Sequence, residues 1–313
     1  MAQDTMSSPG TITPAMAGRS RNKFFQKKIV PWLFIAPIFL LHLFIVALPS
    51  LSAVYYSMTD WSGLGAAEFI GLENYRELLL DDKTFRIALG NNVTWLLIFI
   101  TIPFILALVA ASLLAAIKRG AMPIRASLFI PYILPSVITT TIWSNLLSPR
   151  LGVLKQLPEA IGLPGSDIAL LGNTDTVLPT IAFIDNWHFW GFLMVLFLAA
   201  MQNIPPDLYD AAKIDGANRW HEFRHVTVPG IRPTLVLMLL MVSIWSFLVF
   251  DYVWILTQGG PAGASEVLGS HLYKQAFLRF EAGYASAIGL TMSMFALCMI
   301  GVFAFLRKRG WEI

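Results

Sequence analysis

Long apolar runs without charged side chains are the feature that most limits what this chain can fold into. Four stretches of at least 24 residues contain no Asp, Glu, Lys or Arg, and two more, residues 176–206 and 233–257, contain one carboxylate each. A helix that crosses a bilayer needs about 20 mostly apolar residues. The sequence therefore predicts an all-α membrane protein with six transmembrane helices, at about residues 29–57, 88–117, 126–148, 177–201, 233–257 and 283–306.

Composition agrees with this class. Of the 313 residues, 56% are hydrophobic and 13% are charged, whereas soluble domains carry about 25% charged residues. These values exclude a soluble exterior and a disordered chain. The single cysteine, Cys298, excludes an internal disulfide framework and a cysteine-based zinc cluster. No G-x-x-x-x-G-K-[ST] loop occurs, so we expect no ATP and no other cofactor to bind to this chain.

The distribution of Lys and Arg predicts the orientation in the membrane. With the N-terminus inside, the inner segments hold 15 Lys and Arg and the outer segments hold 7. Because inner loops are enriched in these residues, both termini are expected in the cytoplasm. Residues 1–28 are polar and then basic, which indicates a disordered cytoplasmic tail ahead of the membrane domain at 29–309. Prolines inside the spans, Pro135 among them, predict kinks.

The inner connection between the fourth and fifth spans, residues 203–229, is longer than most helix connections. Pro206 suits the first turn of a helix, Gly216 suits the left-handed residue that ends it, and Asn218 can cap a second short helix. That second helix is expected to stop before Pro229. Two short helices with apolar and charged residues suit a groove in another protein or, as an alternative, the membrane surface.

The same loop carries a recognisable pattern. Asp210-Ala211-Ala212, three residues, Gly216, nine residues and Val226-Thr227-Val228-Pro229 resemble the "EAA" loop of bacterial ABC importer permeases, with Asp for Glu and Val for Ile and Leu. The Asp215-Gly216-Ala217 run, Trp220 and Phe223 look like the carbohydrate branch of that family, of the maltose and glycerol-phosphate type. So do Phe69-Ile70-Gly71-Leu72-Glu73-Asn74-Tyr75, Ile130-Pro131-Tyr132 and Leu256-Thr257-Gln258-Gly259-Gly260-Pro261.

The resemblance implies a type I ABC importer permease fold, a non-catalytic role and a set of partners. In that family, loop 203–229 is the coupling helix that docks on the ATPase. Its expected contact residues are Asp210, Ala211, Ala212, Asp215, Gly216, Trp220, Phe223 and Pro229. The implied partners are a second, non-identical permease, two ATPase subunits that carry ATP and Mg, and an extracytoplasmic sugar-binding protein that docks on the 60–82 and 258–283 loops. The implied location is the bacterial cytoplasmic (inner) membrane, and no nucleic acid is expected as a partner.

A different class of protein is suggested by His221-Glu222-Phe223-Arg224-His225. It matches H-E-x-x-H, in which two histidines share a helix face and hold zinc. A catalytic zinc needs a third protein ligand, and no carboxylate or histidine beyond Pro229 is expected at the level of His221. We therefore expect no metal here, and a membrane zinc metalloprotease is a remote alternative.

Two acids lie inside the predicted spans, where ionisable groups usually face a cavity. Asp185 and Asp251 are expected at similar depths on the fourth and fifth spans. Carboxylates and amides bond hydroxyl groups, and aromatic faces stack on sugar rings, so we expect a substrate path lined by Asp185, Asn186, Trp187, His188, Phe189, Asp251, Tyr252 and Trp254. Alternatively, the tryptophans form an interfacial belt and the acids pair structurally.

The expected function is therefore that of a permease subunit that passes a sugar into the cytoplasm by alternating access. Another small solute, such as glycerol phosphate or a polyol, is the alternative within transport.

Overall fold

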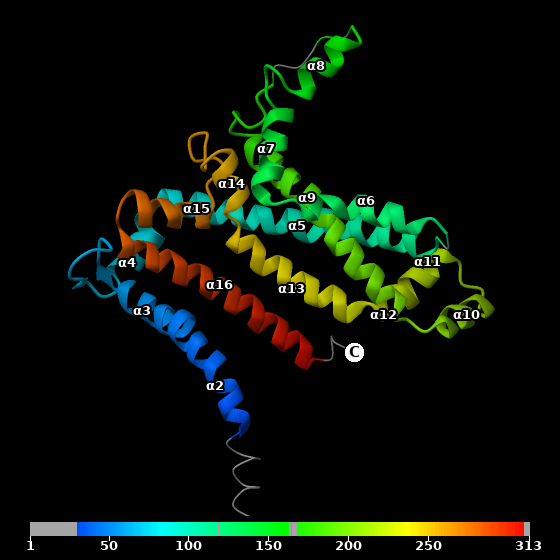
Figure 1. The fold of residues 1–313 in the computed structure, drawn as a ribbon, viewed down its shortest axis with the longest axis horizontal. Helices are drawn as coiled ribbons and strands as arrows, with labels where there is room; N and C mark the ends of the chain where they lie inside the picture. Colours follow the sequence, from blue (N-terminus) through cyan, green and yellow to red (C-terminus); the bar gives the residue numbers. More distant parts are fainter. Residues whose placement is uncertain (1–29, 118, 163, 165–167, 310–313) are drawn as a thin grey trace, which may run out of the picture. The chain divides into compact units, whose positions relative to one another are not determined.

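The computed structural model describes residues 30–117, 119–162, 164 and 168–309. The predicted tail at 1–28 lies outside the described residues. The chain divides into two compact units, Met1–Ala53 and Val54–Ile313, which are described separately below. Figure 1 follows both along the sequence from blue to red.

The first unit contains one apolar helical segment. It comprises α2 (Val30–His42), a π-helical turn η1 (Leu43–Ala47) and the beginning of α3 (Leu48–Tyr56). The whole run, Val30–Tyr56, is 27 residues long, and none of its residues is buried within this chain. An apolar helix that is exposed all round is typical of a surface that meets lipid or another apolar partner.

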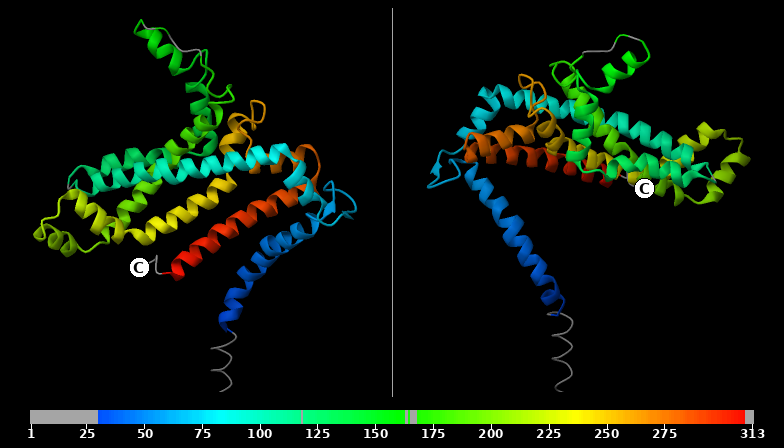
Figure 2. Two further views of the ribbon diagram at one scale, coloured as in Figure 1. Left: turned by 180° about the vertical axis from the view of Figure 1, so that it is seen from behind. Right: turned by 45° about the horizontal axis from the view of Figure 1, so that its top comes forward.

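Four long helical segments form the second unit. They are α5 (Lys83–Ala115), α9 (Val177–Gln202), α13 (Arg232–Leu248) followed by the short α14 (Asp251–Leu256), and α16 (Ala282–Lys308). Helix α5 packs along α9, and α13 packs against both α5 and α16. The views in Figure 2 show these helices side by side.

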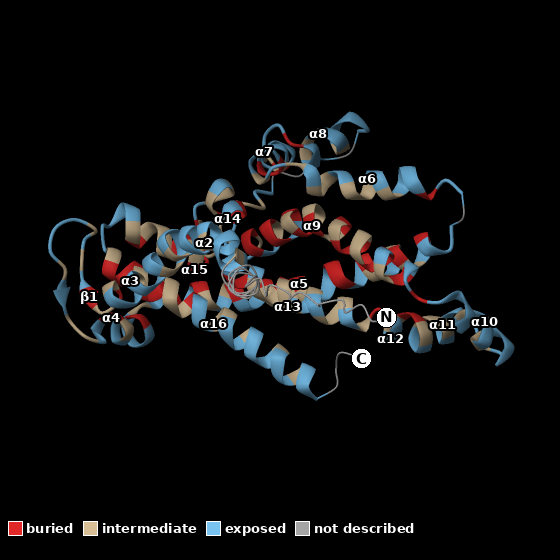
Figure 3. Ribbon diagram, turned by 60° about the horizontal axis from the view of Figure 1, so that its bottom comes forward, coloured by how far each residue is buried: buried red, intermediate tan, exposed pale blue. Residues whose placement is uncertain are grey.

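The apolar core of this unit lies between α5 and α9. Trp95, Ile181 and Phe197 are almost fully buried there, and Phe104 of α5 packs at a tilt against Phe197 of α9. Figure 3 shows the buried residues concentrated along α9 and the facing side of α5, while α16 is largely exposed. The exposed apolar surface of the outer helices is consistent with a bilayer as solvent.

The third predicted span is two helices. α6 (Ala121–Ile133) and α7 (Ser136–Leu146) meet at an angle of 95°. Pro135 disfavours the helical conformation of the residue before it, and Leu134 is accordingly extended, with ψ of 133°. The kink predicted at Pro135 is confirmed. Helix α6 packs closely on α9. A Cβ added at Gly191 of α9 would overlap the carbonyl oxygen of Leu128 of α6.

Short elements join the long helices. β1 (Thr59–Asp60) and β2 (Glu68–Phe69) form a two-residue antiparallel pair, followed by α4 (Glu73–Arg76) and the π-helical turn η2 (Glu77–Asp81). α8 (Val153–Ala160) follows α7. α15 (Leu268–Tyr273) and the π-helical turn η4 (Lys274–Leu278) precede α16.

Within the part of the chain that the structure describes, five helical segments are long and apolar enough to cross a membrane, and the bent α6–α7 pair makes up to six. The predicted all-α class is confirmed.

Candidate functional site

The loop between α9 and α13 folds as two short helices joined at a glycine. α10 (Pro206–Ile214) is followed by α11 (Arg219–Glu222), the π-helical turn η3 (Phe223–Thr227) and α12 (Val228–Gly230). Pro206 stands in the first turn of α10, and the side chain of Asn218 accepts a hydrogen bond from the His221 N–H at 3.0 Å. The predicted place of Pro206 in the first turn and the predicted capping role of Asn218 are both confirmed.

One expectation about this loop is wrong. The helical path does not stop before Pro229, because Pro229 lies inside α12 near its first residue. Proline is tolerated at the beginning of a helix, where its missing N–H has no partner to lose. The chain therefore enters α13 through a nearly continuous helical path.

Gly216 has the predicted left-handed conformation, with φ of 80°. The Ala217 N–H donates to the Ala212 carbonyl at 2.9 Å across this bend. A Cβ at Gly216 would meet nothing within 4 Å. The glycine is therefore required by backbone conformation and not by packing.

The loop is fixed internally but presents apolar side chains outward. The Tyr209 and Thr227 hydroxyl groups are hydrogen bonded at 3.0 Å, which ties α10 to η3. Ile214 is 87% exposed and Trp220 is 62% exposed, and Trp220 stacks on Phe223. Asp210, Ala211, Asp215 and Gly216 are exposed as well, while Ala212 and Phe223 are half-buried. An ordered loop with large exposed apolar groups is typical of a docking surface.

The two histidines of the H-E-x-x-H sequence stack on each other with ring centroids 5.9 Å apart. Nδ1 of His221 lies 2.8 Å from the Asn218 side-chain oxygen, and Nδ1 of His225 lies 3.1 Å from the His221 carbonyl. Within the described residues, no group of three or more His, Cys, Asp or Glu side chains is placed to hold a metal ion.

A cavity of about 360 Å³ lies within the second unit, between α5, the α6–α7 bend, α9 and the α13–α14 junction. Helix α13 ends at Leu248, and α14 begins at Asp251 after a break at Val249 and Phe250. The lining combines aromatic rings with a few polar groups, which is the usual character of a small-molecule site. The polar groups include Asp185, His188 and Asp251.

Five of the eight residues expected on the substrate path line this cavity: Asp185, His188, Phe189, Asp251 and Tyr252. The other three lie elsewhere. Asn186 is buried, Trp187 packs edge-on against Trp143, and Trp254 packs on Phe250 and Tyr273. Trp254 follows Asp251 by three residues in α14, but it is not among the residues that line the cavity.

The polar contacts in the cavity are sparse. The Ser136 hydroxyl donates to Oδ2 of Asp251 at 3.4 Å, and Nε2 of His188 lies 3.0 Å from the carbonyl oxygen of Leu134, to which it donates. The Tyr252 side chain is buried, and its hydroxyl has no hydrogen-bond partner among the described residues.

Ten further lining residues were not predicted from the sequence, because the packing of several helices brings them to the cavity. They are Trp95, Phe99, Tyr132, Ser136, Val242, Trp245, Ser246, Leu248, Val249 and Phe250. One signal was available. Tyr132 belongs to the Ile130-Pro131-Tyr132 run already noted in the sequence.

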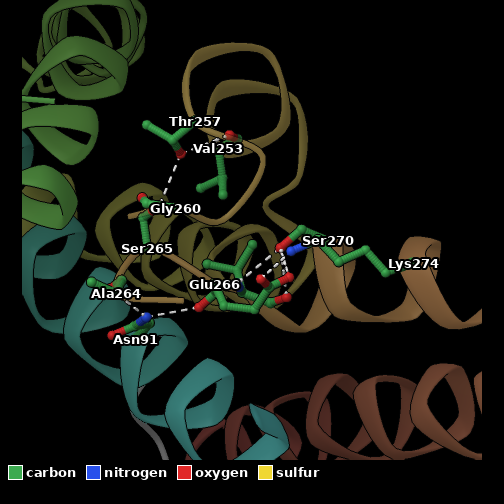
Figure 4. Close-up of polar contacts among 10 residues, drawn as sticks. Asn91, Val253, Thr257, Gly260, Ala264, Ser265, Glu266, Ser270 and Lys274 are labelled. Atoms are coloured by element: carbon green, nitrogen blue, oxygen red, sulfur yellow. Dashed lines mark hydrogen bonds and ion pairs between the residues drawn. The ribbon is translucent and has the colours of Figure 1, made fainter. Parts of the chain in front are cut away.

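A polar cluster fixes the segment between α14 and α15 (Figure 4). The buried Glu266 carboxylate pairs with Lys274 and accepts a hydrogen bond from the Ser270 hydroxyl at 2.8 Å. The Asn91 side chain, on α5, donates to the carbonyls of Ala264 and Glu266. The cluster therefore holds this segment against α5.

A second cluster joins η2, α15 and α16 through Asp82. Its Oδ2 atom lies 2.7 Å from both Nε2 of His271 and the Tyr284 hydroxyl, and Oδ1 accepts from the Phe85 N–H at 2.9 Å. Burial alone would raise the pKa of Asp82, but the Phe85, Tyr284 and His271 contacts together bring it below its ordinary value.

Comparisons with known proteins agree with these features. Residues 11–311 match the model of a family described as "Binding-protein-dependent transport system inner membrane component". The chain is 35% identical to the probable ABC transporter permease protein YurN of Bacillus subtilis, over 88% of this chain and 94% of that protein. It is 31% identical to the probable starch degradation products transport system permease protein AmyD of Thermoanaerobacterium thermosulfurigenes, over 93% and 98%.

A solved structure has the same fold. It is a bacterial alginate ABC transporter in complex with alginate pentasaccharide-bound periplasmic protein, with a TM-score of 0.82 and 21% identity over 93% of this chain and 98% of that chain.

Proposed function

This chain belongs to the family of binding-protein-dependent transport system inner membrane components, and from that premise we propose that it is the permease subunit of an ATP-driven sugar importer. It would form the membrane path with a second, non-identical permease. Two ATPase subunits would hydrolyse ATP with Mg, and an extracytoplasmic binding protein would deliver the sugar. The chain itself would carry out no catalysis.

The geometry of loop 203–229 is the observation that carries the proposal. Its two short helices meet at the left-handed Gly216 and hold Ile214 and Trp220 outward. Tyr209 and Thr227 tie the two helices together, so a push on the loop is transmitted to the ends of α9 and α13. An ATPase that closes on ATP could in this way switch the spans between inward- and outward-facing states.

The cavity supports a sugar as the cargo. Aromatic rings such as Trp95, Tyr132 and Trp245 can stack on the C–H face of a sugar ring, while Asp185 and Asp251 can accept hydrogen bonds from its hydroxyl groups. Its volume of about 360 Å³ lies within the range of small-molecule sites. A relative over nearly the full length, AmyD, is named for starch degradation products, which favours a carbohydrate over a polyol or glycerol phosphate.

The zinc metalloprotease alternative has no support in the geometry. Family membership explains the loop that contains the H-E-x-x-H sequence. A catalytic zinc would need a third protein ligand, and the described residues do not place one beside the two histidines.

Cysteine cross-linking tests the proposed docking of the ATPase. Cys298 is the native cysteine of the chain, so Cys298→Ser gives a background without thiols. In that background, Ile214→Cys and Trp220→Cys are each labelled with a maleimide–diazirine photo-crosslinker, which needs no thiol on the partner, in membranes that contain the whole complex. We expect adducts with the ATPase subunit from both positions.

The matched control is Ser62→Cys, in the β1–β2 connection, where the residue is exposed but is expected outside. It should give no adduct with the ATPase. Adducts from Ser62 and none from the loop would overturn the proposed coupling role.

Fusions of a cytoplasm-active reporter test the orientation. A reporter inserted at Arg119 or placed after Arg309 should be active, and one inserted at Asp81 should be inactive, because the inner segments hold 15 of the 22 Lys and Arg residues. Activity at Asp81 would reverse the orientation and remove the loop from the cytoplasm.

A further inference from the structure

The charge of the cavity lining is unbalanced. Asp185 and Asp251 both line it, and the described lining residues include no Lys or Arg. The two carboxylates are close enough to interact electrostatically. The Ser136 hydroxyl is the described side chain that donates to Asp251. The negative charge held on these two acids repels a further anion that enters the cavity.

A second observation marks the same space as a place for a ligand. Tyr252 is only 7% exposed, lines the cavity and has a hydroxyl group without a hydrogen-bond partner among the described residues. A buried hydroxyl is normally satisfied by protein, water or ligand. Tyr252 and the carboxylates together form a wall that can accept several hydrogen bonds and donate one.

The Nε2–H group of His188 donates to the Leu134 carbonyl at the α6–α7 bend, so this donor is already engaged within the protein. The remaining lining is aromatic or aliphatic apart from Ser246, whose hydroxyl donates to the Val242 carbonyl. The described wall therefore offers strong acceptors and no fixed cation for an anionic group.

We propose that Asp185 and Asp251 make the cavity a charge filter, which admits neutral and amine-bearing saccharides and rejects saccharides that carry a carboxylate or a phosphate. The proposal rests on the proposed function and narrows its substrate class. Hydroxyl and ammonium groups donate hydrogen bonds to carboxylates. A uronate or a sugar phosphate would instead bring a further negative charge into the same space.

The test measures direct binding without the external binding protein, so that its selectivity does not enter. The full-length chain, assembled with its permease and ATPase partners in nanodiscs, is titrated with glucose, glucosamine and glucuronate. Binding is followed by tryptophan fluorescence, since Trp95 and Trp245 line the cavity, and by saturation-transfer NMR of the sugar. We expect glucose and glucosamine to bind at least about tenfold more tightly than glucuronate, a factor equal to about 1.4 kcal/mol.

In the Asp185→Asn/Asp251→Asn double variant, which keeps the side-chain size, the preference should shrink to within about threefold, or less than 1 kcal/mol. Asp251→Asn alone should give an intermediate ratio, and it keeps the test available if the double variant fails to assemble, because Asp251 is exposed in this chain. The control Asp175→Asn removes an exposed acid outside the cavity and should leave the ratio unchanged.

Equal binding of glucuronate and glucose by the unmodified complex would overturn the charge filter, and so would an unchanged ratio in both acid variants. Absence of binding by all three sugars would also overturn it. In each case, ATPase adducts from Ile214→Cys would show that the proposed transport role stands without the filter.

Discussion

Replacement of Gly216 tests whether the bend of the coupling loop is needed for transport. Its φ of 80° lies in the left-handed region, which a β-branched residue adopts only with strain. Gly216→Val should therefore disfavour the bent loop by about 1–3 kcal/mol. An energy of this size lowers the population of the bent loop by about 5–150-fold.

The open space around Gly216 separates the effect of backbone conformation from the effect of steric overlap. Because a Cβ there would meet nothing within 4 Å, the valine should cause no clash, and membrane insertion and thermal stability should be unchanged. Gly216→Asn is the matched variant, since asparagine tolerates the left-handed region far better than valine. Gly216→Asn also adds a side chain, but it should retain most of the coupling between ATP hydrolysis and sugar transport.

The assay is ATP hydrolysis by the reconstituted complex, with and without its sugar-loaded binding protein, together with sugar uptake into the same vesicles. We expect Gly216→Val to lose stimulation and uptake and Gly216→Asn to keep both. Wild-type coupling in Gly216→Val would refute the role of the bend. Equal loss in both variants would show that side-chain bulk, and not backbone conformation, is responsible.

The remaining predictions concern one residue each. His221→Ala should reduce transport only slightly, because Asn218 still caps the Trp220–His221 turn through its bond to the backbone N–H; complete loss of uptake with normal assembly would reopen a metal role. Asp82→Asn should lower the melting temperature at pH 7, followed by tryptophan fluorescence in detergent, with a cost of about 1–3 kcal/mol for the buried partners left unpaired. The pKa of Asp82 in the folded state lies below its ordinary value, so the stabilisation by its carboxylate is present at neutral pH and is lost as the pH falls below about 4. Asp82→Asn should lack this loss of stability at low pH. Gly191→Val should reduce the amount of folded protein in the membrane, whereas Gly90→Val, where a Cβ would meet nothing within 4 Å, should not.

Local signals explain why the conformation of loop 203–229 could be predicted from the sequence. Pro206, Gly216 and Asn218 each act on backbone groups within a few residues, so no knowledge of the tertiary fold was needed. The exception, Pro229, also has a local explanation, because a helix can begin at a proline as readily as it ends before one.

The cavity could be predicted only in part. Asp185 and Asp251 stand out in any sequence of this kind because acids are rare in spans. By contrast, Trp95 and Trp245 look like ordinary apolar span residues, and only the packing of α5 and α13 around α9 brings them to the acids. Nothing in the sequence, neither Gly nor Pro, signals the break at Val249 and Phe250.

The burial of Glu266 could not be predicted from the sequence. This side chain is 2% exposed and is paired with Lys274, which is eight residues away. A pair at that separation is set by the turn between α14 and α15, which the sequence does not specify.

The contact of Gly191 with the Leu128 backbone restricts how the membrane domain can rearrange. Where a helix lies directly on the main chain of its neighbour, neither can slide along the other without a collision. The close contact therefore favours movement of α6 together with α9. The joint at Leu134 and Pro135 is less constrained, because none of the described helical hydrogen bonds crosses the 95° corner from α6 to α7. Tyr132 and Ser136 on either side of that joint line the cavity, so a change of angle at the joint would change the shape of the cavity.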